Sequence, residues 1–469
     1  MIHVDFGAAD RPKYVVLEGA VRQAVVDGTL PVGTKLPPVR ELAWTVGVTP
    51  GTVARVYRAL TDAGLLEASV GRGTFVADRA PPPPIYEEFQ PLAVDSTPHR
   101  TGGDVDRVDM LSPHLPAVGQ TGLIRSLLAE IAADPPSGLM HYPVFAAERP
   151  TREAAAAFLR NDALGPLEPD DITLTHGGQH GIALVLQTVL RTNRPTVLVE
   201  ELSYPGFRRL AELLRASVGT VPADEHGILP DALDDVATRT GARVLCTSPD
   251  LQNPTLAVMP LERRRRIVEV ARRHDLQILE DDCYLMTPSG IDSFRKLAPE
   301  RTWHVSSVAK TISPALRLGF AMAPPSAQMA LRRSAEYNAF GLATPMSDLA
   351  AKLLVHPDLR AIMDAVRDEV GRYVAIARDG LRGHDLRCRD DASFLWLTLP
   401  PGWRASAFCR AAEGAGVKLR AAEEYAARDA NAPHAVRFAV NGGVTHASYA
   451  RAIARLRALL DDPMEGPDV

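Results

Sequence analysis

A lysine and an arginine in one short segment could anchor a small molecule that carries both an aldehyde and a phosphate. Lys310 lies in Ser306-Ser-Val-Ala-Lys-Thr-Ile-Ser-Pro-Ala-Leu-Arg-Leu-Gly-Phe320, and Arg317 comes one short stretch later. A lysine amine can hold an aldehyde as a Schiff base. A guanidinium suits a phosphate because its fork donates two hydrogen bonds to phosphate oxygens. These two residue types could therefore supply a covalent amine anchor and a phosphate contact.

This segment resembles the lysine signature of fold type I aminotransferases and of MocR regulators, which join a GntR-type head to such a domain. The resemblance implies pyridoxal 5'-phosphate (PLP) as cofactor, with Lys310 as its covalent anchor. It also implies Arg317 and Ser307 as phosphate ligands. An ordinary surface lysine is the alternative, which the other motifs, in family order, disfavour.

Three acidic residues, Glu280, Asp281 and Asp282, follow an apolar run in Leu279-Glu-Asp-Asp-Cys-Tyr284. The resemblance places Asp281 against the pyridine nitrogen and Tyr284 near the cofactor's 3-oxygen. Asp281 would keep the nitrogen protonated, which makes the ring an electron sink. Asp282 is the alternative for this role. Asn253 matches the family's donor to the 3-oxygen, and a turn asparagine before proline is the alternative interpretation.

A glycine turn and an aromatic residue extend the set. Thr175-His-Gly-Gly-Gln-His-Gly-Ile182 should end a strand and open a helix, whose positive end would present the amides of Gly178 and Gln179 to phosphate. The family places an aromatic ring in the next motif, so Tyr204 would stack on the pyridine ring.

Two more positions follow from the resemblance. Tyr142 matches a tyrosine that reaches the partner subunit's phosphate, and Arg437 matches the arginine that binds a substrate carboxylate. A packed interface tyrosine and a surface arginine are the alternatives. The resemblance thus names Lys310, Asp281 and Tyr204 as catalytic residues and Arg437 as the effector-binding residue.

Three residues depart from the family pattern without removing a cofactor-holding group. Leu256 replaces the glycine usual after Asn-Pro-Thr, Ala309 replaces the serine before the lysine, and Leu202 replaces a proline before Tyr204. Leu256 and Ala309 neighbour the cofactor loops, so both weaken the case for efficient turnover.

The chain around these motifs has the pattern of an α/β domain. Short apolar runs at Thr196–Val199, Arg243–Thr247 and Gln277–Leu279 predict buried, mostly parallel strands, and Pro260–His274 predicts a covering helix. We expect residues 106–469 to form a PLP-dependent aminotransferase fold type I domain with large and small lobes. Residues 79–105 are rich in proline and are typical of a semi-rigid linker.

The first 78 residues predict a separate winged helix-turn-helix domain of α+β class. Helices are expected at Tyr14–Asp27, Leu36–Val46 and Pro50–Ala63, the last capped by Thr49. Strands at Leu65–Ala68 and Gly73–Ala77 would form a hairpin with a basic tip, which is a candidate wing.

This segment resembles the GntR type of winged helix in Gly28–Ala43, Gly47–Val53 and Gly71–Val76. The resemblance implies double-stranded DNA as a partner and contacts to phosphates and base edges. The candidate DNA-binding residues are Arg40, Thr52, Arg55, Arg58 and Arg72. Solvated surface charge is the alternative for each arginine. Thr49-Pro50 replaces the family's frequent Ser-Arg, so one usual basic contact is missing.

Composition limits the other classes. The net charge of -5 gives no global attraction to nucleic acid, so DNA binding must come from a local patch. The cysteines lie far apart, which argues against a disulfide framework and against a metal site. No segment indicates export or a membrane span, so we expect a cytoplasmic protein.

Three functions remain open. The first is a regulator in which PLP on Lys310 senses an amino compound through aldimine exchange, in a homodimer that the fold resemblance makes head-to-tail. The second is a genuine aminotransferase with an accessory DNA-binding head, and the third is a regulator that has lost PLP. The fused head favours regulation over physiological turnover, although an intact lysine leaves transamination open.

Overall fold

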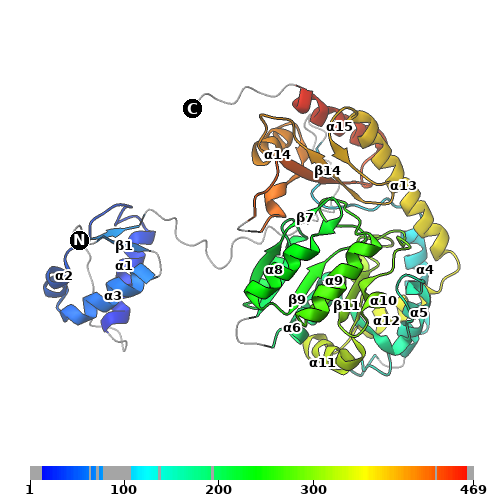
Figure 1. Cartoon of the computed structure of the whole chain (residues 1–469), viewed down its shortest axis with the longest axis horizontal. Coiled ribbons are helices and arrows are strands. Elements are labelled where there is room, and N and C mark those ends of the chain that lie inside the picture. Colours follow the sequence, from blue (N-terminus) through cyan, green and yellow to red (C-terminus); the bar gives the residue numbers. More distant parts are fainter. Residues whose placement is uncertain are drawn as a thin grey trace. The chain divides into compact units, whose positions relative to one another are not determined.

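The computed structural model describes residues 13–62, 65–69, 73–77, 107–135, 139–191, 195–427 and 430–461 (Figure 1). The chain divides into two compact units, Met1–Thr101 and Gly102–Val469, which we describe separately. The predicted linker at 79–105 lies outside the described residues. Within those ranges, no helix has the length and apolar character that a membrane crossing requires.

The first unit is a three-helix bundle with a β-hairpin. Its elements are α1 (Lys13–Val26), α2 (Val39–Val46), α3 (Pro50–Asp62), β1 (Leu66–Ser69) and β2 (Gly73–Val76). The two strands pair antiparallel. One apolar core joins the helices to the hairpin through Leu17, Leu42, Val53, Leu60, Leu66 and Val76. The predicted winged helix is confirmed.

The second helix starts later than predicted. The expectation that it begins at Leu36 is wrong, because the helix begins at Val39. The Leu36 N–H donates to the Thr74 carbonyl of the hairpin at 2.8 Å, so this residue is engaged with β2. Pro37 and Pro38 follow, and a residue before proline is disfavoured in helical conformation.

A seven-stranded sheet forms the large lobe of the second unit. Its order is β4 (Ile172–Thr175), β12 (Gly319–Met322), β11 (Thr302–Ser307), β10 (Gln277–Asp281), β9 (Val244–Thr247), β5 (Thr196–Glu200) and β6 (Ser217–Val221). β12 runs antiparallel to both neighbours, and the other neighbouring pairs are parallel. The predicted strands are β5, β9 and β10. Residues that follow the parallel strands therefore meet at one edge of the sheet.

Helices cover both faces of this sheet (Figure 1). One face packs against α6 (Gly178–Val189), α7 (Pro205–Leu213) and α11 (Gln328–Ala339), and the other against α8 (Pro230–Thr240), α9 (Leu261–Arg273) and α10 (Phe294–Leu297). Neighbouring residues of β10 serve different faces, with Ile278 on the α9 side and Leu279 on the α6 side. A further core joins β4 and β12 to α4 (Gln120–Ala133), α5 (Arg149–Leu159) and α12 (Thr344–Leu354).

The small lobe is an antiparallel sheet covered by helices. Its strand order is β13 (Leu386–Arg387), β14 (Phe394–Thr398), β17 (Ala435–Ala439) and β16 (Arg420–Ala421), with helices α13 (Leu359–Gly380), α14 (Ala405–Gly414) and α15 (His446–Asp461). β3 (Val108–Asp109) pairs with β15 (Val417–Lys418), so the start of the unit also joins this lobe. A small hairpin, β7 (Ala223–Asp224) and β8 (Gly227–Ile228), follows β6.

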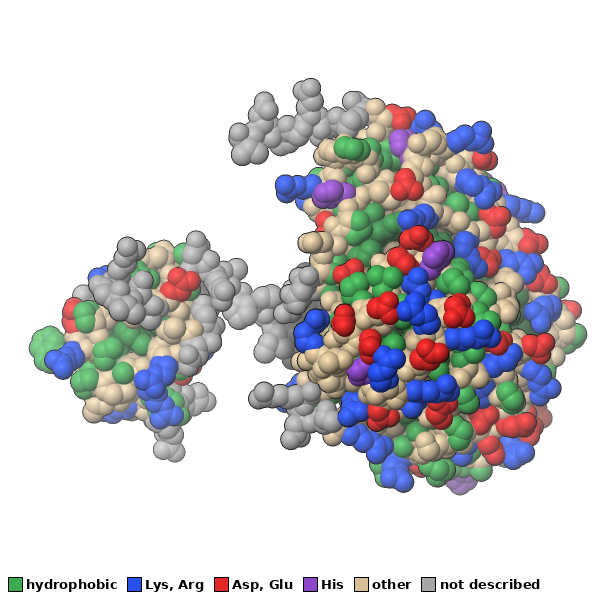
Figure 2. Space-filling model, in the orientation of Figure 1, with side chains coloured by type: hydrophobic (Ala, Val, Ile, Leu, Met, Phe, Trp, Pro, Cys, Tyr) green, Lys and Arg blue, Asp and Glu red, His purple; other side chains and the backbone are tan. Residues whose placement is uncertain are grey.

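Acidic and basic side chains are interspersed over the large-lobe face that α8 and α9 cover (Figure 2). Arg266 lies 2.6 Å from Asp231, and Arg273 lies 2.6 Å from Asp234. Paired charges of this kind give no uniform field on this face, so it offers no broad basic surface for nucleic acid.

Candidate functional site

The motifs singled out in the sequence meet at the carboxyl edge of the large sheet. β10 ends in Asp281 and leads to Tyr284, and β11 ends in Ser307 and leads to Lys310. β4 leads into the glycine turn at the start of α6. Because these strands run in the same direction, their following residues lie on one side of the lobe.

Lys310 and Arg437 lie near the same tyrosine ring. The Lys310 ammonium nitrogen is 4.9 Å from the ring centroid of Tyr284, and the Arg437 guanidinium carbon is 5.9 Å from it. Burial alone would raise the pKa of the Tyr284 hydroxyl, but Lys310 and Arg437 hold this pKa below its usual value. Lys310 belongs to the large lobe and Arg437 to β17 of the small lobe, so the site includes both lobes.

Arg437 keeps part of its hydrogen-bonding capacity free. The residue is only 2% exposed, and its Nη1 donates to the Leu111 carbonyl at 3.1 Å. Its Nε and Nη2 make no hydrogen bond of ordinary geometry within the described structure, although the guanidinium lies close enough to the Tyr284 hydroxyl to help lower the pKa of that group. Buried donors without a partner are costly, and a bound carboxylate would satisfy both.

The two candidate aspartates have different surroundings. The Asp282 carboxylate lies 3.6 Å from His304 Nε2. Asp281 is close enough to Tyr204 and Tyr284 to influence the pKa of each hydroxyl. Burial raises the pKa of Asp281 itself. A cation beside Asp281, such as a protonated ring nitrogen, would offset this cost of burial.

The glycine turn forms a cradle beside Arg317. Gly177 has a φ of 85°, and a Cβ there would lie 2.8 Å from Arg317 Nη2. That nitrogen donates to the His176 carbonyl at 3.1 Å. The helix α6 begins directly after this turn, with Gly178 and Gln179 in its first turn. An arginine fork and a helix N-terminus in one place fit a phosphate group.

Further predicted residues border the same edge. Asn253 is buried, and its Oδ1 has no hydrogen-bond partner within the described ranges. The Tyr204 hydroxyl donates to Gln179 Oε1 at 2.6 Å, which joins the aromatic motif to the glycine turn. The Ser307 hydroxyl donates to the Leu318 carbonyl at 3.3 Å and accepts from the Ala309 N–H at 3.0 Å. These donors and the unpartnered Asn253 oxygen fit a ring with polar substituents and a phosphate.

Leu256 adopts the conformation that usually requires glycine. Its φ is 60°, a left-handed value that costs about 1–2 kcal/mol for a residue with a Cβ. Its side chain is buried in an apolar cluster at the junction of the lobes, together with Phe394 and Trp396. The packing of this side chain offsets the backbone strain, which explains how the departure is tolerated.

Tyr142 does not join this group in the single chain. It is 78% exposed, and its ring lies 5.2 Å from that of Phe340. Met140, Val144 and Tyr337 are also exposed. An apolar surface of this kind is typical of a protein interface.

The head presents most of its predicted residues at the surface. Arg40 is exposed on α2, and Arg55 and Arg58 are exposed on α3. The Arg55 guanidinium stacks 3.9 Å from the ring centroid of Tyr14. Thr52 is half-buried, with its hydroxyl 2.9 Å from that of Thr49. Arg72 lies outside the described residues.

Comparison with known proteins assigns both units. Residues 120–456 match the family described as aminotransferase class I and II, and residues 13–76 match the bacterial regulatory proteins of the gntR family. The chain belongs to the class I and II aminotransferase family. Its GntR head gives it the domain organisation of the MocR-type regulators, and the predicted family is confirmed. This family implies PLP as cofactor and DNA binding by the head.

Relatives share the whole arrangement. YdeF of Bacillus subtilis, an uncharacterized HTH-type transcriptional regulator, is 25% identical over 97% of this chain and 96% of its own length. The probable rhizopine catabolism regulatory protein MocR of Rhizobium meliloti is 26% identical over 88% and 86%. The structure of LysN, an alpha-aminoadipate aminotransferase from Thermus thermophilus, shares the fold, with a TM-score of 0.66 over 76% of this chain and 92% of that chain at 23% identity.

Two residues of this MocR-type chain near the site, Arg420 and His180, are not among the predicted ones. Arg420 pairs with Arg437 across β16 and β17, and its Nε donates to the same Leu111 carbonyl at 3.0 Å. His180 Nδ1 accepts from the His176 N–H at 3.0 Å. Burial, His176 and Arg317 lower the pKa of His180 to about 4, so the ring is neutral at pH 7. The sequence held no signal for Arg420, whereas His180 stood within the quoted glycine motif.

Among the residues that the structure covers, no three His, Cys, Asp or Glu side chains are arranged to hold a metal ion.

Proposed function

We propose that this regulator is cytoplasmic and senses a small molecule that carries both an amine and a carboxylate. The observation that carries the proposal is Arg437, whose Nε and Nη2 are buried without partners in the described structure, beside the ring that Lys310 also approaches. The unpartnered guanidinium atoms would bind the carboxylate of the effector. The amine would then lie toward Lys310 and compete with it for the cofactor.

The residues that would hold PLP form three groups around the ring. Lys310 would hold it covalently, and Asp281 would pair with the ring nitrogen. Asn253, Tyr284 and Tyr204 would contact the ring and its oxygen. Gly178, Gln179, Ser307 and Arg317 would bind the phosphate. When bound, PLP supplies an aldehyde carbon that reacts reversibly with primary amines and a ring that accepts electrons.

The proton balance of the site fits this assignment. The lowered pKa of the Tyr284 hydroxyl results from the two cations near its ring. This hydroxyl can therefore hold or release a proton beside Lys310 at a lower pH than an ordinary tyrosine. Asp281 would hold a proton on the ring nitrogen, because burial leaves its own charge in need of a cation.

An effector that contacts both lobes would favour one arrangement of them. Lys310 stands on the large lobe and Arg437 on the small lobe, so a molecule bound between them has different contacts in open and closed states. A ligand shifts such an equilibrium only by its difference in affinity for the two states. In a dimer this shift would alter how the two heads meet DNA.

We further propose a head-to-tail homodimer in which Tyr142 contributes to the site of the second copy. The exposed apolar residues Met140, Tyr142, Val144 and Phe340 support this interface. In the head, Arg40, Thr52, Arg55, Arg58 and Arg72 would contact DNA, with Arg40 and Arg58 on exposed helix faces. Two heads in one dimer would read two half-sites.

The test follows the visible cofactor band and DNA binding together in the full chain. Wild type, Lys310→Ala and the surface control Lys352→Ala would be titrated with a panel of amino acids, while anisotropy follows a DNA fragment from the gene's own upstream region. We expect the band in wild type and the control only. One amino acid should shift it and change DNA affinity without releasing a keto acid. Continuous keto acid production with no DNA binding would overturn the proposal in favour of an aminotransferase.

A further inference from the structure

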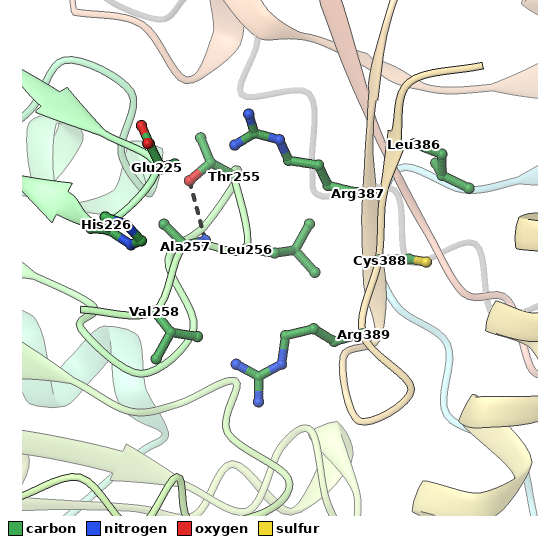
Figure 3. A pocket seen from close by; sticks show the side chains of 10 residues that line it. All are labelled: Glu225, His226, Thr255, Leu256, Ala257, Val258, Leu386, Arg387, Cys388 and Arg389. Carbon is green, nitrogen blue, oxygen red and sulfur yellow. Dashed lines mark hydrogen bonds between the residues drawn. The ribbon is translucent and has the colours of Figure 1, made fainter. Parts of the chain in front are cut away.

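A cavity that is open to solvent lies between the two lobes, lined by residues other than those of the lysine site. Its volume is about 560 Å³, within the range of small-molecule sites. Its lining comes from the turn between β7 and β8, from the loop 255–258 and from β13 with the residues after it (Figure 3): Glu225, His226, Thr255, Leu256, Leu386, Arg387, Cys388 and Arg389 among them. Lys310, Tyr284 and Arg437 do not line it.

The two arginines of this cavity differ in how their charge is used. Arg389 is paired with Asp391 at 2.9 Å and also donates to the Asp250 carbonyl at 3.0 Å. Arg387 is exposed and has no side-chain hydrogen bond or ion pair with any residue that the structure describes. Both side chains extend from the small lobe toward the 255–258 loop (Figure 3). Arg387 therefore offers a free cation to a molecule in the cavity.

The 255–258 loop and the hairpin turn, which face the arginines, indicate the polarity and charge of the ligand. The loop presents the apolar side chains of Leu256, Ala257 and Val258. Glu225 stands on the hairpin turn without an ion pair in the described structure, so a second negative charge on the ligand would meet repulsion. An apolar body with one carboxylate matches these walls better than a dianion or a neutral molecule.

Leu256 connects this cavity to the lysine site. Its side chain lines the cavity and also packs in the apolar cluster between the lobes. Its N–H donates to the Gln252 carbonyl at 2.8 Å. Thr255 donates through its N–H and its hydroxyl to the Gln252 side-chain oxygen, at 2.9 and 2.6 Å. These hydrogen bonds close the turn that carries Asn253. A ligand that displaces Leu256 would therefore also displace this turn.

We propose that this cavity is a second effector site, which binds a small organic acid through Arg387. The ligand would join β13 of the small lobe to the 255–258 loop of the large lobe and thereby restrict their relative motion. Binding itself does not depend on the proposed sensing function. Only its consequence for DNA affinity rests on that function.

Binding can be measured by titration calorimetry on the full chain with benzoate, phenylacetate and hexanoate. Benzamide, which carries no charge, and phthalate, which carries two, should both bind more weakly than benzoate. We expect at least one monocarboxylate to bind, with about tenfold weaker binding in Arg387→Gln, because a charge-assisted hydrogen bond is lost. The exposed control Arg382→Gln, near the end of α13, should bind as wild type does. No binding by any of the three acids, or equal binding by Arg387→Gln, would overturn the proposal.

Two further variants locate the bound acid. The variants Lys310→Ala and Arg437→Gln should bind the acid as well as wild type, whereas loss of binding in either would place the acid in the lysine site and overturn the proposal.

Discussion

Two adjacent carboxylates on β10, Glu280 and Asp281, differ in where they find their partners. Glu280 accepts from the Phe294 N–H at 2.8 Å, from the Arg295 N–H at 3.1 Å and contacts His304 Nδ1 at 3.2 Å. Asp281 faces the other side of the sheet, where its carboxylate accepts from the Cys283 N–H at 3.0 Å. The Glu280 carboxylate therefore has its hydrogen-bond partners within the protein, whereas Arg437 and Asn253, near Asp281, have polar atoms that a ligand would complete.

The same contrast extends to neighbouring residues. Behind Glu280, the buried Arg264 lies 2.6 Å from Asp250 and donates to the Met259 carbonyl at 2.9 Å. Beside Asp281, two nitrogens of the Arg437 guanidinium and Asn253 Oδ1 lack partners in the described structure. Buried polar groups without partners cost free energy, and those of Arg437 and Asn253 belong to residues expected around the cofactor, where a ligand would complete them.

The largest loss of stability is expected when the buried ion pair between Arg264 and Asp250 is broken. Arg264→Ala removes one partner of a fully buried ion pair, which should lower the free energy of unfolding by about 3–5 kcal/mol. Urea denaturation followed by circular dichroism measures this. Arg266→Ala, on the same helix but half-exposed in its pair with Asp231, should cost under about 1 kcal/mol. Similar losses for both variants would contradict the distinction between the two sides.

Arg437→Gln tests whether the unpartnered donors of Arg437 serve ligand binding rather than stability. The free energy of unfolding should change by less than about 1 kcal/mol, because two of the removed donors have no partner in the described structure. Affinity for the amino carboxylate should fall roughly ten- to hundredfold, since a charge-assisted contact contributes about 1.5–3 kcal/mol. Titration of the cofactor band gives this affinity. Arg410→Gln, exposed on α14, serves as control. A large stability loss without a change in affinity would assign Arg437 a structural role.

The two carboxylates should also have opposite pH dependences in the cofactor-free protein. Burial raises the pKa of Asp281 above its unfolded value, so the free energy of unfolding falls as pH rises from about 4 toward that raised pKa. Burial also acts on Glu280, but His304 lowers its pKa overall, so its contribution is lost as pH falls below about 4 through the lowered pKa.

Asp281→Asn should therefore remove the loss of stability at higher pH, and Glu280→Gln should remove part of the loss in acid. Denaturation midpoints measured across pH check both. Asp281→Asn should also weaken PLP binding about tenfold, which corresponds to about 1.4 kcal/mol. Parallel pH profiles for the two variants would refute the contrast.

Among the variants at the cofactor loops, the smallest effect is expected for Leu256→Gly, at the junction of the two lobes. Leu256→Gly relieves a left-handed backbone but removes a buried leucine side chain, so the net loss of stability should be about 1 kcal/mol. Leu256→Ala keeps the strain and should lose more, about 2–3 kcal/mol. Thermal unfolding compares them. A glycine variant less stable than the alanine variant would show that strain is negligible here.

The sequence determined the elements and the family. Apolar runs predicted β5, β9 and β10, and spaced motifs predicted the head, the aminotransferase domain and PLP. These features depend on short-range patterns of polarity and on residue types that a given chemistry requires, so they can be read along the chain. The predicted start of α2 was wrong because the Leu36 N–H donates to the carbonyl of Thr74, in a strand that comes later in the sequence.

Only the tertiary structure decided which side chains face one another. It directs Asp282 toward His304, brings Arg420 beside Arg437 across two strands, and opens a cavity between a hairpin and β13. Leu256 was a departure from a motif in the sequence and is a packed residue of the lobe junction in the fold. Such relations join residues tens to hundreds of positions apart, and burial and partner choice arise only when the chain has folded.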